Sequence, residues 1–120
     1  MRALFDTNIL IDFLNAVPQA RKEVALYSQR AISIITWMEV MAGADQKTEA
    51  LTRGFLKAFE VLPLNADIAE RAVTLRRSHR LKLPDAIIWA SADVLSRLLI
   101  TRNTKDFGSD TPGVRIPYAI

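Results

Sequence analysis

Short apolar runs and amphipathic stretches alternate along this chain. The runs at 3–6, 31–36 and 97–101 consist mainly of apolar residues and are predicted to be strands. Mainly apolar runs of this length are typical of strands that are buried on both faces of a parallel sheet. Two weaker strands are expected at 60–64, where Pro63 indicates an edge position, and at 114–118.

Stretches with helical periodicity separate these strands. After the first strand, "TNILIDFLN" places Ile9, Leu10, Phe13 and Leu14 on one helical face. Further helices are expected over residues 18–28, 36–44, 45–59, 65–79 and 84–96. Strands that alternate with helices predict an α/β fold of three layers, α/β/α, around a central, mostly parallel sheet of four to five strands.

Composition narrows the class of protein. At 120 residues, half of them hydrophobic, the chain is expected to be a single domain spanning 1–120 with its own core. It contains no cysteine and one histidine, His79, which excludes disulfides, thiolate metal sites and two-histidine catalysis within one chain. A signal peptide and an apolar run of bilayer length are both absent, so a cytoplasmic protein without membrane contact is expected.

The charge of the chain is mildly basic, with a formal net charge of +3 and a pI of about 9.6. That balance permits a polyanionic partner such as nucleic acid, but ordinary enzymes share it. Charge alone therefore leaves the partner open.

Four acidic residues fall at or just beyond the predicted strand ends, and in a parallel sheet these ends form the edge where ligands gather. They are Asp6, Glu39, Asp85 and Asp106, the last with Asn103 close by. Each also has a purely structural explanation. Asp6 could cap a helix, Glu39 could complete a capping box, Asp85 could favour the helix dipole, and Asp106 could form a turn.

If the four acids lie close together, they indicate a site for a divalent cation. Clustered carboxylates repel one another and raise one another's pKa, and a bound divalent cation relieves that repulsion. Oxygen ligands without cysteine or histidine favour Mg²⁺ or Mn²⁺. Ions of this kind serve phosphodiester hydrolysis by an activated water.

Four blocks in order, "FDTNILIDFL", "ISIITWMEVMAG", "LKLPDAIIWASA" and "LLITRNTKDF", resemble the motifs of the PIN domain, and more narrowly of VapC-type toxins. The resemblance implies a Mg²⁺- or Mn²⁺-dependent endoribonuclease with Asp6, Glu39 and Asp85 as core acids. Asp106, or Asn103 directly or through water, would complete the site, and one metal ion or two remain open. By the same resemblance, the supporting polar residues are Thr7, Asn8 and Thr101.

The resemblance also implies partners. The substrate would be a tRNA or another structured RNA, and basic residues near the acids could hold its phosphates. These residues are Arg80, Lys82, Arg102 and Lys105. Apolar helices, including the face of 50–59, would form a groove for the C-terminal tail of a cognate antitoxin, and a homodimer is expected.

Two other classes of protein share part of this pattern. A receiver-like signalling domain needs paired acids after the first strand, whereas Asp6 stands alone there. A catalytically idle PIN-like module that binds RNA or protein is disfavoured by the three core acids, and it remains the alternative.

Overall fold

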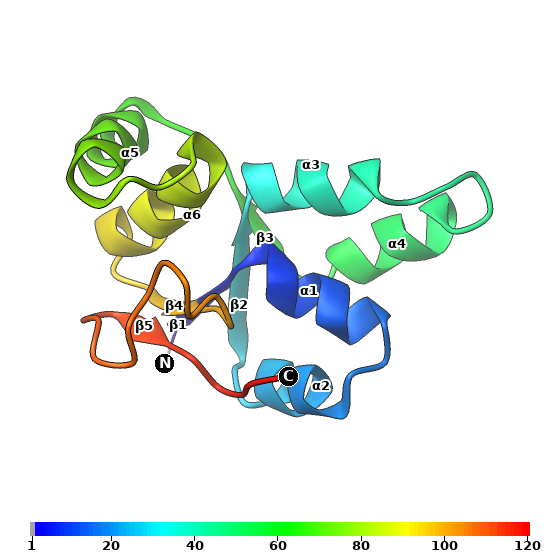
Figure 1. Ribbon diagram of the computed structural model, residues 1–120. Helices are drawn as coiled ribbons and strands as arrows, with labels where there is room; N and C mark the ends of the chain where they lie inside the picture. The colour runs from blue at the N-terminus through cyan, green and yellow to red at the C-terminus, as the bar shows by residue number, and fades with distance from the viewer. Residues whose placement is uncertain (1) are drawn as a thin grey trace.

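The computed structural model describes residues 2–120, and its centre is a sheet of five strands (Figure 1). All strand pairs are parallel, in the order β3-β2-β1-β4-β5. The strands are β1 (Arg2–Phe5), β2 (Gln29–Ser33), β3 (Glu60–Leu62), β4 (Leu98–Ile100) and β5 (Val114–Arg115). Leu4 of β1 pairs with Ala31 on one side and with Leu99 on the other, so β1 is the central strand.

Helices cover both faces of the sheet, which confirms the predicted α/β architecture. They are α1 (Thr7–Leu14), α2 (Pro18–Ala25), α3 (Ile34–Ala42), α4 (Glu49–Leu56), α5 (Ala66–His79) and α6 (Leu83–Val94). Helices α1 and α2 pack on one face and α6 on the other, with α5 against α6 (Figure 1). Helix α3 contacts α1, α4 and α6.

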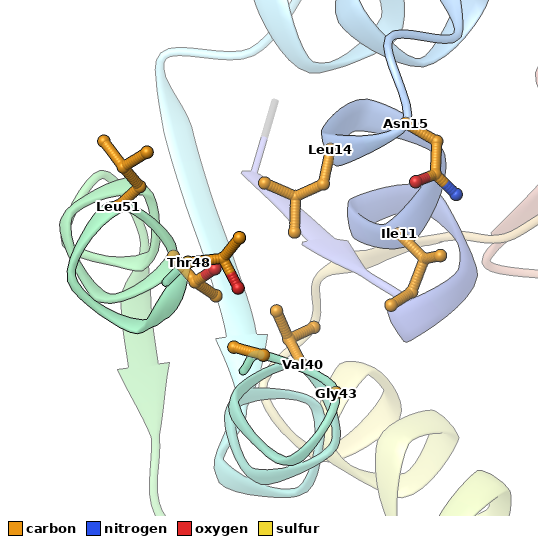
Figure 2. Close-up of a pocket in the computed structure, with 9 residues that line it drawn as sticks. Ile11, Leu14, Asn15, Val40, Gly43, Thr48 and Leu51 are labelled. Atoms are coloured by element: carbon orange, nitrogen blue, oxygen red, sulfur yellow. The ribbon is translucent and has the colours of Figure 1, made fainter. Parts of the chain in front are cut away.

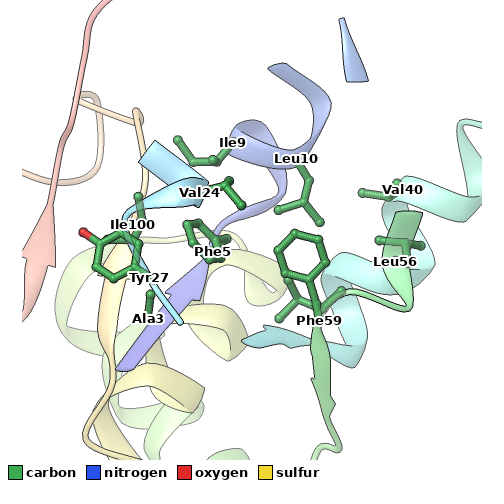
Figure 3. Packing of buried hydrophobic residues seen from close by; sticks show 11 residues of the cluster. Ala3, Phe5, Ile9, Leu10, Val24, Tyr27, Val40, Leu56, Phe59 and Ile100 are labelled. Carbon is green, nitrogen blue, oxygen red and sulfur yellow. The ribbon is translucent and has the colours of Figure 1, made fainter. Parts of the chain in front are cut away.

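The core on the α1 and α2 face is built around Phe5. Its ring lies edge-on to those of Tyr27 and Phe59, with centroids 5.8 Å away in each case, and no part of Phe5 reaches solvent (Figure 3). Truncating a buried phenylalanine to alanine typically costs about 3–5 kcal/mol. Phe5 therefore fixes the end of β1, and with it the backbone of the next residue, Asp6.

The opposite face is packed by small and β-branched residues of α6. Ile88 and Ala92 contact Leu4 and Leu99, while Ala86 and Ala90 face the cluster that α5 shares with α6. A helix held from two sides has little freedom to move. Its first turn, which carries Asp85, is consequently fixed relative to the sheet.

The boundary between β2 and α3 differs from the prediction. The strand ends at Ser33, whose hydroxyl accepts a hydrogen bond from the amide of Ile35 at 3.0 Å and thereby caps α3. Thr36 consequently lies inside the helix. The alternative explanation of Glu39, that it completes a capping box with Thr36 as the N-cap, is therefore wrong, and Glu39 accepts a hydrogen bond from Thr7 instead.

Several other elements are shorter than expected. The predicted helix over 45–59 begins only at Glu49, because the Asp45 carboxylate accepts the amides of Lys47 and Thr48 at 2.9 Å each and holds a turn. Helix α2 ends at Ala25, and β5 is confined to Val114–Arg115. None of the helices described within 2–120 is long and apolar enough to span a bilayer.

Candidate active site

The ends of β1 and β4 lie beside each other at the point where the strand order reverses. From β1 the chain moves outward through β2 to β3, and it then returns to add β4 on the other side of β1. In open parallel sheets, ligands bind in the crevice at such a switch point. Asp6 follows β1 and Thr101 follows β4, so both residues stand at this crevice.

Asp6 is held in one orientation by its neighbours. Its carboxylate accepts hydrogen bonds from the amide of Thr7 at 2.7 Å and from the hydroxyl of Thr101 at 2.8 Å, with a longer one from the Asn8 amide at 3.4 Å. Only 7% of the residue is exposed. Asp6 is thus both the N-cap of α1 and a buried acid at the crevice.

Glu39 reaches the same edge from α3. Its carboxylate accepts the hydroxyl proton of Thr7 at 2.7 Å, and the Thr7 hydroxyl also lies 2.9 Å from that of Thr36. Because Thr7 has one proton and gives it to Glu39, Thr36 is the donor in the second bond. The two threonines therefore connect α1 to α3 beside Asp6.

The segment after β4 brings in the fourth acid. The Asn103 side chain donates to the Asp106 carboxylate at 2.8 Å and accepts the amides of Lys105 and Asp106 at 3.1 and 3.2 Å. The amide of Asn103 in turn donates to the Thr101 hydroxyl at 3.1 Å. Asn103 and Asp106 thus form a closed turn attached to Thr101.

The acids influence one another electrostatically. The pKa of Asp6 is raised to about 6, chiefly by burial. The hydrogen bonds from Thr101 and Thr7 act to lower this pKa, and the nearby charges of Asp85 and Glu39 contribute to raising it. Burial also raises the pKa of Asp85, followed by the charges of Asp106 and Glu39, with Lys82 acting in the opposite direction. The four predicted acids consequently form one interacting group at the carboxyl edge of the sheet.

Basic residues share a cleft with part of this group. The cleft has a volume of about 300 Å³. It is lined by Arg80, Lys82, Asp85, Asn103, Lys105 and Asp106. Arg80 ends α5 in a left-handed conformation, with φ of 55°, and this turn carries the chain into Lys82 and α6. Three of the four basic residues predicted near the acids therefore lie at the cleft.

The donor chemistry of the group suits a hard divalent cation, since every candidate ligand is an oxygen. Within residues 2–120, however, no three histidine, aspartate or glutamate side chains are close enough to hold one ion together. Glu39 and Asp106 instead accept hydrogen bonds from Thr7 and Asn103. Shared coordination therefore requires these carboxylates to move closer together.

Arg102 lies in a different environment from the one expected of a substrate contact. Its guanidinium donates two hydrogen bonds to the Asp12 carboxylate, at 2.5 and 3.0 Å, and Tyr118 donates a third at 2.8 Å. Sequence reasoning missed Asp12 and Tyr118. A signal for Asp12 existed, because it lies three residues after Ile9 on the buried side of α1, where a charge needs a partner.

Comparisons with known proteins agree with the fold. Residues 3–108 match the family profile described as "PIN domain", while no curated protein matches the chain. A chain of a toxin–antitoxin complex from Klebsiella pneumoniae is 52% identical over 98% of this chain and 99% of that one, with a TM-score of 0.93. A chain of DNA-bound VapBC from Salmonella typhimurium is 26% identical over 97% and 96%, with a TM-score of 0.80. FitAcB from Neisseria gonorrhoeae, 20% identical over 98% and 99% with a TM-score of 0.79, shares the fold.

Proposed function

This chain belongs to the PIN domain family, as its four sequence blocks predicted, and from that premise we propose that it is a metal-dependent endoribonuclease and the toxin of a toxin–antitoxin pair. One observation carries the proposal. A buried aspartate, Asp6, lies at the switch point of the sheet, and its pKa is raised by burial and by two further acids. Among the described residues Asp6 makes no direct ion pair, and only the more distant charge of Arg102 acts in its favour. Burying an acid in this way is unfavourable, which is typical of a functional site.

The acids would hold the metal ion. Asp6, Glu39, Asp85 and Asp106 supply carboxylate oxygens, and Asn103 supplies an amide oxygen. Mg²⁺ or Mn²⁺ bound there would polarise the scissile phosphate and lower the pKa of a water nucleophile.

The hydroxyl and amide side chains around the acids orient them. Thr101 and the Thr7 amide bond to Asp6 and favour its ionised form, while the Thr7 hydroxyl holds Glu39 on the α3 side. Asn8 bridges Asp6 and Thr101 through its amide nitrogen. Supporting bonds of this kind typically affect metal affinity or activity 10- to about 100-fold.

The substrate would be a structured RNA, a tRNA for example, whose phosphates contact the cleft. Lys105, Lys82 and Arg80 place positive charge beside Asp85 and Asp106. Positive groups next to an acidic site let a polyanion approach carboxylates that would otherwise repel it.

The antitoxin would bind on the other side of α1. An apolar hollow of about 460 Å³ lies between α1, α3 and α4, with Ile11 and Leu14 on one wall and Leu51 on the other (Figure 2). Leu51 is 78% exposed, although it is a large apolar residue. A partner segment that inserts apolar side chains here would cover it.

A second hollow of about 320 Å³ lies between α1, α2 and α4. Phe13 and Phe55 stack there with centroids 4.8 Å apart, and the guanidinium of Arg21 lies over the Phe13 ring. Aromatic walls beside a positive charge suit a partner segment that carries both apolar and acidic residues. The same apolar surface area is available to a homodimer, which sedimentation of the isolated protein would detect.

Cleavage of a structured RNA by the purified protein tests the proposal. We expect cleavage with Mg²⁺ or Mn²⁺ and none in EDTA. Asp6→Asn, Glu39→Gln and Asp85→Asn should each abolish cleavage, since each removes ligand charge. Asp67→Asn is the matched control, because Asp67 occupies the first turn of α5 as Asp85 does that of α6, and it should retain full activity.

Two results would contradict the proposed nuclease function. One is cleavage that persists in EDTA. The other is a parent protein that cleaves no RNA in either metal while still binding RNA or the antitoxin, which would identify a catalytically idle module.

A further inference from the structure

A second buried carboxylate lies on α1 just beyond the candidate active site. Asp12 is 3% exposed and accepts both hydrogen bonds of a two-pronged ion pair with Arg102, while the Tyr118 hydroxyl donates to the same carboxylate. Both partners of Asp12 are distant from it in the sequence. The C-terminal segment and the segment after β4 are thus tied to α1 at one point.

This point is connected to the candidate active site through Asn8. Asn8 stands one helical turn before Asp12, and the backbone amide of Arg102 donates to its side-chain oxygen at 3.3 Å. The amide nitrogen of Asn8 then donates to Thr101 at 3.2 Å and to Asp6 at 3.4 Å. A displacement of Arg102 therefore moves the group that bridges Thr101 and Asp6.

We propose that Asp12, Arg102 and Tyr118 form a positioning clamp that sets Asn8 and Thr101 against Asp6. Arg102 is then a positioning residue and does not bind substrate phosphate. The catalytic consequence of the clamp rests on the proposed nuclease function, whereas the placement of Asn8 by the clamp does not.

The geometry of the ion pair supports this role. A guanidinium that donates two parallel bonds fixes direction as well as distance, which a lysine ammonium cannot do. The Asp12 side chain is 5% exposed and that of Arg102 is 34% exposed, so the pair is mostly shielded from water. Its position is consequently better defined than that of a surface ion pair.

The chain contains a chemically matched pair elsewhere. Glu23 on α2 accepts two hydrogen bonds from Arg115, at 2.7 and 3.0 Å, and a third from the Tyr27 hydroxyl at 2.8 Å. Among the described residues, the side chains of these three form no hydrogen bond to Asp6, Asn8 or Thr101; the backbone carbonyl of Arg115 accepts the Thr101 amide at 3.1 Å, and a side-chain substitution leaves that bond available. The Glu23 group therefore serves as an internal control for loss of stability without loss of positioning.

The experiment compares equivalent substitutions in the two groups. Arg102→Lys and Tyr118→Phe perturb the clamp, and Arg115→Lys and Tyr27→Phe perturb the control. The first measurement is the side-chain amide signal of Asn8 in ¹H–¹⁵N NMR spectra of the metal-free protein, assigned by its loss in Asn8→Ser.

The clamp variants should shift the Asn8 signal and the control variants should leave it in place. An unmoved Asn8 signal in Arg102→Lys, or an equal shift in Arg115→Lys, overturns the proposal. This measurement does not require nuclease activity. A parent protein that cleaves no RNA would therefore refute the proposed nuclease function, while the Asn8 signal would still test the clamp.

The second measurement is RNA cleavage by the same variants. Arg102→Lys should lower kcat by about 10- to 100-fold, the range typical of residues that orient a site, with KM changed less than about twofold. Arg115→Lys should change neither. A KM that rises in Arg102→Lys together with a weaker salt dependence would instead identify Arg102 as a phosphate contact and overturn the proposal.

Discussion

The effect of Asp6→Asn on the free energy of unfolding should change sign between acidic and neutral pH. The substitution Asp6→Asn keeps the shape of the side chain and a good capping residue, but it removes the charge. In the folded protein the pKa of Asp6 rises from 3.8 to about 6, chiefly through burial. The folded state therefore binds a proton more tightly than the unfolded chain does.

The magnitude follows from these two pKa values. A difference of about two pH units corresponds to about 3 kcal/mol. Because the folded pKa is the higher one, this stabilisation is fully present below pH 3.8 and is lost as pH rises through about 6. At pH 7.5 the parent protein consequently carries an ionised, buried carboxylate that costs about 3 kcal/mol relative to a neutral group.

An opposing contribution comes from hydrogen bonding. The two Asp6 oxygens accept hydrogen bonds from the Thr7 amide and the Thr101 hydroxyl. Asparagine has one acceptor oxygen, so one donor loses its partner at a cost of about 1–3 kcal/mol. At pH 7.5 the variant should then be about 0–2 kcal/mol more stable than the parent, and at pH 4 it should be less stable.

Urea unfolding in EDTA at four pH values between 4 and 7.5 measures both proteins. Asp67→Asn is the control, since Asp67 is exposed at the start of α5, and its difference from the parent should stay nearly constant. Repeating the series in Mn²⁺ at a hundredfold excess over the dissociation constant should stabilise the parent by about 2.7 kcal/mol and the variant much less.

One pattern of results would refute the reasoning. If Asp6→Asn is less stable than the parent by a similar amount at every pH, and neither protein responds to Mn²⁺, Asp6 is only a helix cap.

Three further predictions concern other parts of the molecule. Lys105→Ala should weaken RNA binding and flatten its logarithmic salt dependence by about one unit, whereas Lys22→Ala on α2 should not; equal slopes in titrations at several salt concentrations would contradict this. Leu51→Asp should weaken antitoxin binding at least about tenfold in calorimetry without lowering the Tm, and Val73→Asp on α5 should leave the affinity unchanged. Arg97 is buried, and its Nε has no hydrogen-bond partner within residues 2–120, so Arg97→Met should change stability to urea by less than about 1 kcal/mol or increase it; a loss above about 2 kcal/mol would mean that its bonds to Glu60 and the Ala3 carbonyl matter.

The positions of the acids were predictable because they depend on backbone topology. An apolar run followed by Asp6 predicts a buried strand with an acid at its end, and parallel strands bring all such ends to one edge. The same logic placed Asp106 near that edge, whereas Thr101 was expected there only from the resemblance to the PIN domain.

The partners of charged side chains were not predictable in the same way. Arg102 and Lys105 are both basic residues in one short segment, yet Arg102 bonds to Asp12 and Lys105 lines the cleft. Charge and sequence distance do not distinguish these fates. The prediction of where α3 begins failed for a related reason. Ser33 followed by two isoleucines is equally compatible with a strand and with a capped helix.

The sheet order also sets a sequence in time. The hollow between α1, α3 and α4 is lined by residues between Ile11 and Thr52, whereas Asp6 acquires its bond to Thr101 from a residue 95 positions later in the chain. At roughly 5–20 residues per second, synthesis of the stretch between Thr52, the last residue of the hollow, and Thr101 takes about 2–10 seconds. During every round of translation, the surface that we propose for the antitoxin therefore leaves the ribosome before the active site has all its parts.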